Sequence, residues 1–286
     1  MATAGNFPKV TGDIIYLADY NAIQSVIAGV VSTHYGNAVS SGQLSASPTI
    51  AAAPMDLLRA DIDKAYIHIT GSVSGIADIA VGGTIGKDDY NAYKTAADYC
   101  ETNKNSVYAP TQLASSVYSQ SITAAWNSIH TWTYTYTWAN SGLADYWFNT
   151  GGYFSVDVSA DGSTATSKDD DWQNNILNAI PTQTYGNTQW DTGSNQDVYE
   201  YGNISQYAEN YCRIQITKVS STQVSISVTI NDADTGDKVI ADTGGGPFGT
   251  AIDEDVNTNA YASITAYQTT DAITATAPAT SQTSAW

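Results

Sequence analysis

The stretch HTWTYTYTW, residues 130–138, constrains the fold more than any other part of this sequence. Threonines alternate strictly with aromatic rings, and a period of two is the signature of a β-strand. The aromatic face would consist of Trp132, Tyr134, Tyr136 and Trp138. Rings exposed on this scale favour aggregation, whereas each buried ring removes roughly 150–250 Å² from water. We therefore expect this stripe to be buried, in the core or against a neighbouring subunit; exposed, it would be a platform for stacking sugars.

The first hundred residues have the period of helices instead. Apolar residues recur every three or four positions in 17–36, again after Pro54, and again from Asp88. Asp19 is a suitable N-cap and Gly36 a suitable stop for the first of these segments, and Pro54 suits the first turn of the second. The pattern predicts three helices.

Beyond Trp126 the pattern is mixed. Residues 144–162 predict a strand, a glycine pair, a second strand and a turn, and 168–180 predict a short helix packed through Trp172. Residues 183–206 are rich in Gly, Asn and Gln and indicate no element. The segments 211–219 and 223–230 alternate, with a hairpin loop at Ser220 and Ser221, and a later strand includes 264–270. The tail, 271–286, is polar.

These elements predict an α+β fold in three parts. Residues 1–105 form a helical amino-terminal assembly region, 106–186 a central module of mixed structure, and 187–286 a β-sandwich-like carboxy-terminal domain. Short helices with stripes of Ala, Val and Tyr bury little surface alone, so we expect the protein to pack as a symmetric homo-oligomer.

The charge balance argues against several classes of partner. The formal net charge is −18, and only 13% of residues are charged, against roughly 25% in a typical domain. The few Lys and Arg residues are scattered, so neither nucleic acid nor an anionic membrane is an expected partner. The start lacks the pattern of a secretory signal, and no apolar run approaches the roughly 20 residues of a membrane span. We expect a protein made in the cytoplasm.

Groups that could perform catalysis are sparse. His34, His68 and His130 belong to no nucleophile motif, and Cys100 and Cys212 match no zinc or redox spacing, which favours structural roles for all five. The stretch GGGPFG, 244–249, satisfies the letters of a dinucleotide-binding motif but has no βαβ unit around it. The sequence predicts neither an enzyme nor a cofactor.

Three clusters of carboxylates have an alternative interpretation. They comprise Asp169, Asp170 and Asp171; Asp232, Asp234 and Asp237; and Asp253, Glu254 and Asp255. Such clusters can hold calcium, or supply the acid pair of a glycosidase. The 231–237 loop has Gly236 where a third ligand is wanted, and nothing marks one acid as desolvated beside an ionised partner. We expect solvated turn acids, with the first cluster flanking the positive end of the helix led by Trp172.

The segment from Trp126 to Gly186 resembles a module of virion structural proteins from contractile-tailed marine cyanophages. That pattern is an aromatic pair, Asn, a Gly pair and an alternating strand, then a Gly turn, a Lys and a Trp-led helix. It falls here on Trp147, Phe148, Asn149, Gly151, Gly152, Gly162, Lys168 and Trp172. The start is similar too, with GDII, Tyr20–Asn21, Tyr35–Gly36 and a second helix ending at Gly71. Tyr153 stands where the family has a basic residue, and the last hundred residues match nothing familiar.

The resemblance implies a bacteriophage virion protein of the tail-fibre, neck or baseplate type. The expected partners are further copies of the chain and other virion proteins, with a host surface glycan as a further candidate. Of these positions we expect an appendage, with a baseplate, tail or capsid decoration protein as the alternative. A carbohydrate-binding adhesin and a polysaccharide depolymerase are the rivals from other classes. The residues expected to matter for packing and assembly are the stripe of four rings together with Phe148, Asn149, Gly151, Gly152 and Trp172.

Overall fold

The chain folds into two compact units. A computed structural model describes residues 8–45, 50–108, 112–162, 166–204, 207–233, 238–240, 250–252, 258–269 and 271–285. The helical unit comprises 1–113, 141–152 and 268–277, and the sheet unit comprises 114–140, 153–267 and 278–286. The boundary predicted at 106 lies close to Leu113, where the first segment of the helical unit ends. The boundary predicted at 187 falls inside the sheet unit, because strands from before and after residue 187 pair in the same sheets.

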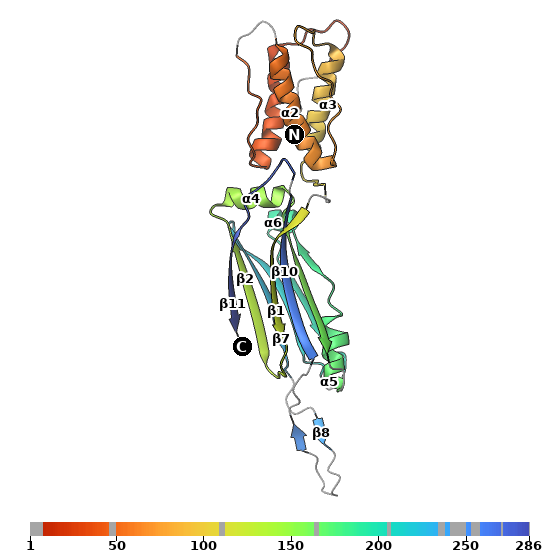
Figure 1. Cartoon of the computed structure of the whole chain (residues 1–286), viewed down its shortest axis with the longest axis vertical. Coiled ribbons are helices and arrows are strands. Elements are labelled where there is room, and N and C mark those ends of the chain that lie inside the picture. Colours follow the sequence, from red (N-terminus) through yellow and green to blue (C-terminus); the bar gives the residue numbers. More distant parts are fainter. Residues whose placement is uncertain are drawn as a thin grey trace. The chain divides into compact units, whose positions relative to one another are not determined.

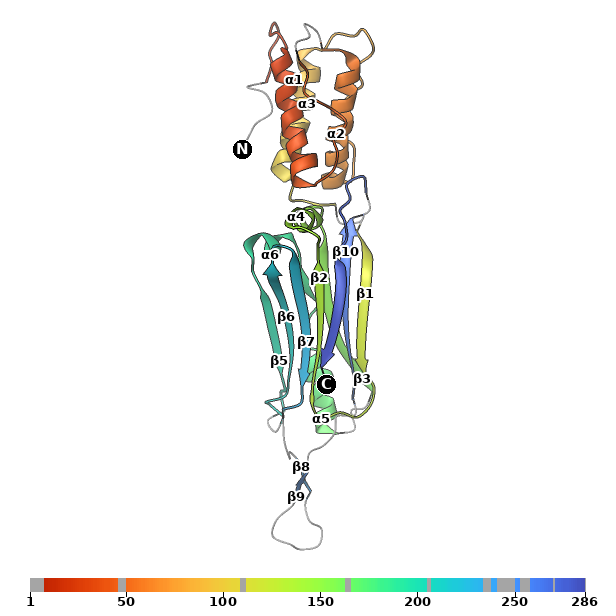
Figure 2. The same ribbon diagram turned by 90° about the vertical axis from the view of Figure 1, so that its left-hand side faces the viewer.

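The helical unit contains the three helices predicted from periodicity. They are α1 (Leu17–Ala28), continued by the π-helical η1 (Gly29–His34), α2 (Ala52–Thr70) and α3 (Lys87–Asn103), which lie side by side in Figures 1 and 2. The prediction of Asp19 as N-cap is wrong. The helix begins two residues earlier, and the Asp19 carboxylate accepts a hydrogen bond of 2.7 Å from the backbone N–H of Tyr16.

A fourth helix in this unit corrects a predicted strand. Residues 144–149 belong to α4 (Ser141–Asn149), whose buried residues are Ala144, Trp147 and Phe148. Their spacing of three and four is helical, and the adjacent aromatic pair had suggested a strand. The helical core also includes Ile273, from a segment far away in the sequence. No helix among the described residues is long and apolar enough to cross a membrane.

The sheet unit is a β-sandwich. One sheet has the order β1 (Gln112–Ile122), β10 (Thr258–Thr269), β3 (Tyr153–Gly162), β4 (Gln183–Tyr185). The other has the order β11 (Ala279–Ala285), β2 (Ile129–Thr137), β7 (Gln223–Asn231), β6 (Tyr211–Ser220), β5 (Gln196–Tyr201). Figure 2 shows the two sheets facing each other. The remaining elements are α5 (Ser167–Asp170), η3 (Asp171–Leu177), α6 (Asn187–Thr192) and the paired strands β8 (Lys238–Ile240) and β9 (Thr250–Ile252).

Alternation along the strands builds the core of the sandwich. On β7 every second residue from Val224 to Ile230 is fully buried, and β2, β6, β3 and β10 contribute buried residues in the same way. The rings of Tyr136 and Phe154, one from each sheet, lie 4.3 Å apart between centroids. The predicted α+β class is confirmed, with a sandwich-like domain that also takes in strands of the predicted central module.

Two regions with no predicted element contain structure. Residues 183–206 include β4, α6 and β5, and the polar tail contains β11. Both β5 and β11 are edge strands, and only part of an edge strand is covered by neighbours, so its sequence needs few apolar residues. The short helix predicted in 168–180 is confirmed, and so is the hairpin, although its turn consists of Ser221 and Thr222 and Ser220 still belongs to β6.

Candidate functional site

The aromatic stripe of β2 is buried inside the sandwich. Its four rings, from Trp132 to Trp138, are at most 3% exposed, and two of them lie against Phe154 of the facing sheet. The prediction of burial is confirmed, with the core of the sandwich as the covering surface. These rings therefore form no platform for sugars. Trp172 is equally buried, with its ring centroid 4.8 Å from that of Trp126.

The glycine pair, Gly151 and Gly152, lies in the helical unit just after α4, which there contacts the end of η1. Gly151 has a left-handed φ of 84°, and a Cβ on Gly152 would overlap the ring of Trp147. The prediction that this glycine pair leaves no room for a Cβ is confirmed at Gly152. Phe148 is fully buried, and the Asn149 side chain donates a hydrogen bond of 2.9 Å to the backbone carbonyl of His34.

The Tyr-Gly turn after the first helix contacts the same segment. Gly36 has a φ of 69°, and a Cβ at this position would overlap the ring of Tyr146 on α4. The Tyr35 hydroxyl donates to the backbone carbonyl of Lys104 at 2.6 Å, and burial raises the pKa of that hydroxyl. The Gly36 and Asn149 contacts join α4 to the end of η1, and the Tyr35 hydrogen bond joins that turn to the end of α3.

An exposed tyrosine cluster covers one end of the outer face of the five-stranded sheet. Tyr199 and Tyr201 on β5 are 40% and 51% exposed and stack with their centroids 5.8 Å apart. Tyr211 on β6 lies 5.8 Å from each ring. The Arg213 guanidinium lies 4.8 Å from the Tyr199 centroid and donates two hydrogen bonds to Asp197, which lower the pKa of that carboxyl.

Hydroxyl groups continue this surface across the sheet. Pairing places Thr229 beside Arg213 and Thr131 beside Thr229, whose hydroxyl oxygens lie 3.1 Å apart. Flat rings next to hydroxyl groups and a guanidinium are suited to stacking on sugars or on another protein surface. The sequence prediction missed the cluster because 183–206 indicated no element. The alternation in DVYEY, residues 197–201, was the available signal.

A buried group of charges lies in the sheet unit, at α5 and the end of β7. Lys168, Asp169, Asp171 and Asp232 are all buried, three of them fully. The Lys168 ammonium lies 2.8 Å from an Asp232 carboxylate oxygen, with both side chains fully buried. The expectation of solvated turn acids is wrong for these carboxylates, because α5 and the chain after β7 fold inward onto the sandwich.

Hydrogen bonds fix the surroundings of this group. Thr166 is the N-cap of α5 and accepts from the backbone N–H of Asp169. Asp171 accepts from the Asn175 side chain at 2.7 Å and from the backbone N–H of Asn203 at 2.9 Å. Asp169 and Asp170 lie in the first turn of the helix, as predicted.

The other predicted acids lie largely outside the described residues. Those are Asp234, Asp237, Asp253, Glu254 and Asp255, together with the 244–249 glycine stretch. Within the described part of the chain, no group of three or more His, Cys, Asp or Glu side chains is arranged to hold a metal ion.

The histidines and cysteines have structural surroundings. His68 is fully buried, and its Nδ1 lies 2.8 Å from a carboxylate oxygen of Asp271, which ties the 268–277 segment to α2. Cys100 and Cys212 are buried free thiols, and burial raises the pKa of each to about 12. A thiol with so high a pKa is a poor nucleophile at neutral pH.

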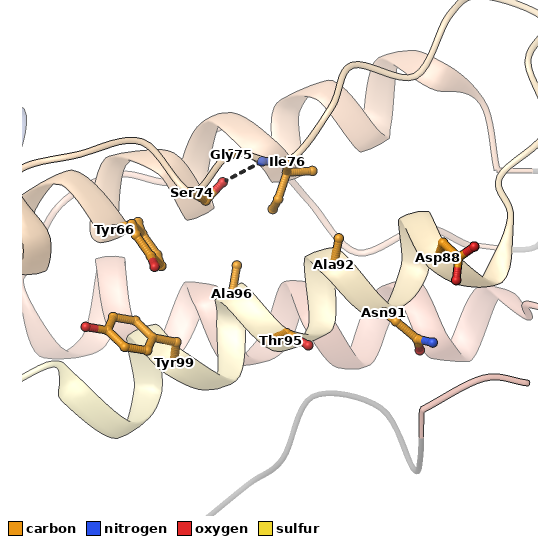
Figure 3. A pocket seen from close by; sticks show the side chains of 10 residues that line it. All are labelled: Tyr66, Ser74, Gly75, Ile76, Asp88, Asn91, Ala92, Thr95, Ala96 and Tyr99. Carbon is orange, nitrogen blue, oxygen red and sulfur yellow. Dashed lines mark hydrogen bonds between the residues drawn. The ribbon is translucent and has the colours of Figure 1, made fainter.

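A groove of about 450 Å³ runs beside α3 in the helical unit (Figure 3). Tyr66 and Tyr99 lie at one end with their ring centroids 5.0 Å apart, and Asp88 lies at the other. Ala92 and Ala96 line the stretch between them. The lining also includes the polar side chains of Ser74, Asn91 and Thr95, so the groove is mixed in character and no part of it marks a reaction site.

Comparison with known proteins adds no relative. No family model matches this chain, and no curated protein or solved structure is significantly similar to it. The residues themselves therefore supply the functional argument. They offer two buried sets of contacts that hold segments together and one exposed aromatic surface.

Proposed function

We propose that this chain is a structural protein of a bacteriophage particle, a tail-fibre or neck-fibre component that assembles as a symmetric homo-oligomer. One observation supports it most. The two blocks of sequence that resemble cyanophage virion proteins contact each other, through Gly36 against Tyr146 and Asn149 against His34. The residues behind the resemblance thus have packing roles, as a structural component requires.

An unprotected sheet edge supports assembly. The edge strand β11 has the sequence ATSQTSA, without a charge or a proline, and residues 281–284 are exposed. Proteins that remain monomeric usually protect such edges with Lys or Pro, because free N–H and C=O groups pair with other strands. At the opposite edge, β5 contains Asp197 and Glu200. We propose that β11 is the edge through which copies of the chain associate.

The test is the mass of the purified protein in solution, measured by light scattering. We expect an oligomer, and we expect Ser281→Pro or Thr283→Lys on β11 to shift it toward the monomer. Glu200→Lys on β5 is the matched control at the opposite edge and should leave the mass unchanged. A monomer at all concentrations would contradict the proposal, as would absence of the chain from purified particles of the phage that encodes it.

The tyrosine cluster favours a second candidate, a glycan-binding module. Aromatic rings exposed side by side are the usual surface for stacking sugars, and Arg213 and the neighbouring threonines supply hydrogen-bonding groups. Binding to a glycan array that Tyr199→Ser with Tyr201→Ser abolishes would support it. Tyr267→Ser removes a ring from the stacked pair with Tyr153 on the other sheet and is the control. Unchanged binding in the double variant would exclude the cluster.

A further inference from the structure

Lys168 and Asp232 form a lysine–carboxylate pair that is fully buried. Their side chains are 0% exposed, and the nitrogen-to-oxygen distance is 2.8 Å. Among the lysines whose side chains the structure describes, Lys168 is the buried one. The pair formed by Lys104 and Glu101 is 31% and 21% exposed, as surface ion pairs usually are. Burying two opposite charges is expensive even when they are paired.

The fold holds the two groups in place from both sides. Lys168 lies in the first turn of α5, and Trp172 four residues later packs against Trp126. Asp232 follows the last residue of β7, and the next backbone N–H, that of Ala233, donates to the Asn210 side chain at 2.8 Å. The amine and the carboxyl therefore meet between segments that are fixed independently of each other.

We propose that Lys168 and Asp232 become joined by an amide bond, a covalent cross-link inside the sandwich. Proton transfer within the pair gives a neutral amine and a neutral acid, forms that burial favours over two charges. The amine nitrogen attacks the side-chain carbonyl carbon of Asp232, a C–N bond forms, and the C–OH bond breaks. The hydroxyl leaves with one amine proton as water, so the reaction needs neither oxidant nor cofactor.

The geometry suits this step. The amine nitrogen already contacts an oxygen bonded to the carbon it would attack, and productive arrangements place such reacting atoms roughly 3–3.5 Å apart. A desolvated lysine is a stronger nucleophile than a solvated one. Full burial also keeps bulk water away from the product, which protects the amide from hydrolysis. The cross-link would close the chain between α5 and the end of β7, independently of any role in a particle.

Mass spectrometry of the intact folded protein tests the proposal. We expect wild-type protein to be lighter than its sequence by one water molecule, and Lys168→Arg and Asp232→Ala to have their full sequence masses. Trypsin should fail to cleave after Lys168 and should yield a branched peptide of residues 105–213 joined to 219–238. A wild-type chain of full mass, cleaved after Lys168, would overturn the proposal whether or not the variants fold.

A partly exposed ion pair in the same chain is the internal control. Lys94 pairs with Asp98 one turn along α3, where both side chains reach solvent. We expect trypsin to cleave after Lys94, because both partners of this pair keep contact with solvent, unlike Lys168 and Asp232. Loss of water localised to peptides around Lys94 would also contradict the assignment to the buried pair.

Discussion

Two buried carboxylates, Asp61 in the helical unit and Asp232 in the sheet unit, are neutralised in different ways. In the helical unit, the nearly buried Asp61 accepts hydrogen bonds from the backbone N–H groups of Ser40 and Ser41 and from the Ser41 hydroxyl, at 2.6–3.0 Å. In the sheet unit, Asp232 lies against a lysine ammonium. Neutral donors fix a carboxylate and leave it an acceptor only, whereas a buried amine beside it is a potential nucleophile.

The difference follows from the architecture of each unit. A loop beside a helix supplies free backbone N–H groups, and Asp61 uses two of them to attach the chain after α1 to α2. The strand β7, which leads to Asp232, pairs with β2 on one side and β6 on the other, so its N–H groups are used in the two ladders. A carboxylate folded inward after β7 therefore needs a partner from another side chain, which α5 supplies.

Of all the predicted changes, removal of the Lys168 amine is expected to cause the largest loss of stability. Lys168→Met removes the group that Asp232 contacts or is joined to and leaves a buried carboxylate without a partner, which costs about 3–5 kcal/mol. We expect the sheet unit to be destabilised, measured by urea unfolding, with hydrogen exchange in α1 to α3 unchanged. In the matched double variant Lys168→Met with Asp232→Leu no unpaired carboxylate remains, so the part of the loss that comes from the buried charge should return. The part that comes from the missing cross-link should not return. Equal stability of the single variant and wild type would mean that the pair is dispensable.

A glycine substitution disturbs the helical unit alone. Gly152→Val places a side chain in the space occupied by the Trp147 ring, and such overpacking costs about 1–3 kcal/mol. We expect a lower melting temperature and poorer recovery of folded protein. Gly29→Ala is the control, because Gly29 has a helical φ of −58° and open space around its Cβ position. Equal melting temperatures of Gly152→Val and Gly29→Ala would contradict the predicted overlap with the Trp147 ring.

The sequence predicted the parts whose buried face lies within one continuous segment. The helices α1 to α3 and the strand β2 show their period directly, so their existence and the burial of Tyr136 were predicted. Strand partners were not predicted, because β3 pairs with β10, which aligns Ala160 with Ala260 across a hundred residues. Periodicity within a strand contains no information about such distant partners.

Burial of the charged group could not be predicted for the same reason. A run of three acids after Lys168 has the composition of a solvated turn, and only the position of α5 against the sandwich turns the lysine and two acids inward. The tyrosine cluster was missed for a different reason. Its rings alternate over a few residues of an edge strand, and Tyr211 joins them only through the pairing of β5 with β6.

Acid should weaken the helical unit through His34. Burial lowers the pKa of His34 to about 4, with the charge of Lys104 as a second cause. The unfolded chain binds this proton below about 6.5 and the folded chain only below about 4, so stability is complete above the higher value and falls as the pH decreases between them. Allowing for partial exposure, we expect a loss of about 1–2 kcal/mol between pH 7.5 and 5.

The measurement is urea unfolding of wild type and His34→Gln across that range. The variant should lose the part of the pH dependence that His34 contributes. Burial also lowers the pKa of His130 in the sheet unit, which acts in the same direction, so His130→Gln is the companion variant for that unit. Identical slopes for wild type and His34→Gln would show that His34 is protonated equally in both states.

The smallest expected loss of stability is that of Asp170→Asn, which we compare with the same change at the neighbouring Asp171 in the sheet unit. Asp170 is half-buried at the start of the helix and accepts from the Asn174 side chain, so Asp170→Asn should cost only about 0.3–1 kcal/mol, the usual value of an acid near a helix amino terminus. Asp171 is fully buried and fixes the backbone of Asn203, so Asp171→Asn should cost more, about 1–3 kcal/mol. Urea unfolding of the two single variants measures both losses of stability. Similar losses of stability in the two variants would mean that the Asp171 contacts add nothing beyond the helix dipole. Loss of an assembly or binding activity at unchanged stability would instead give these carboxylates a functional role.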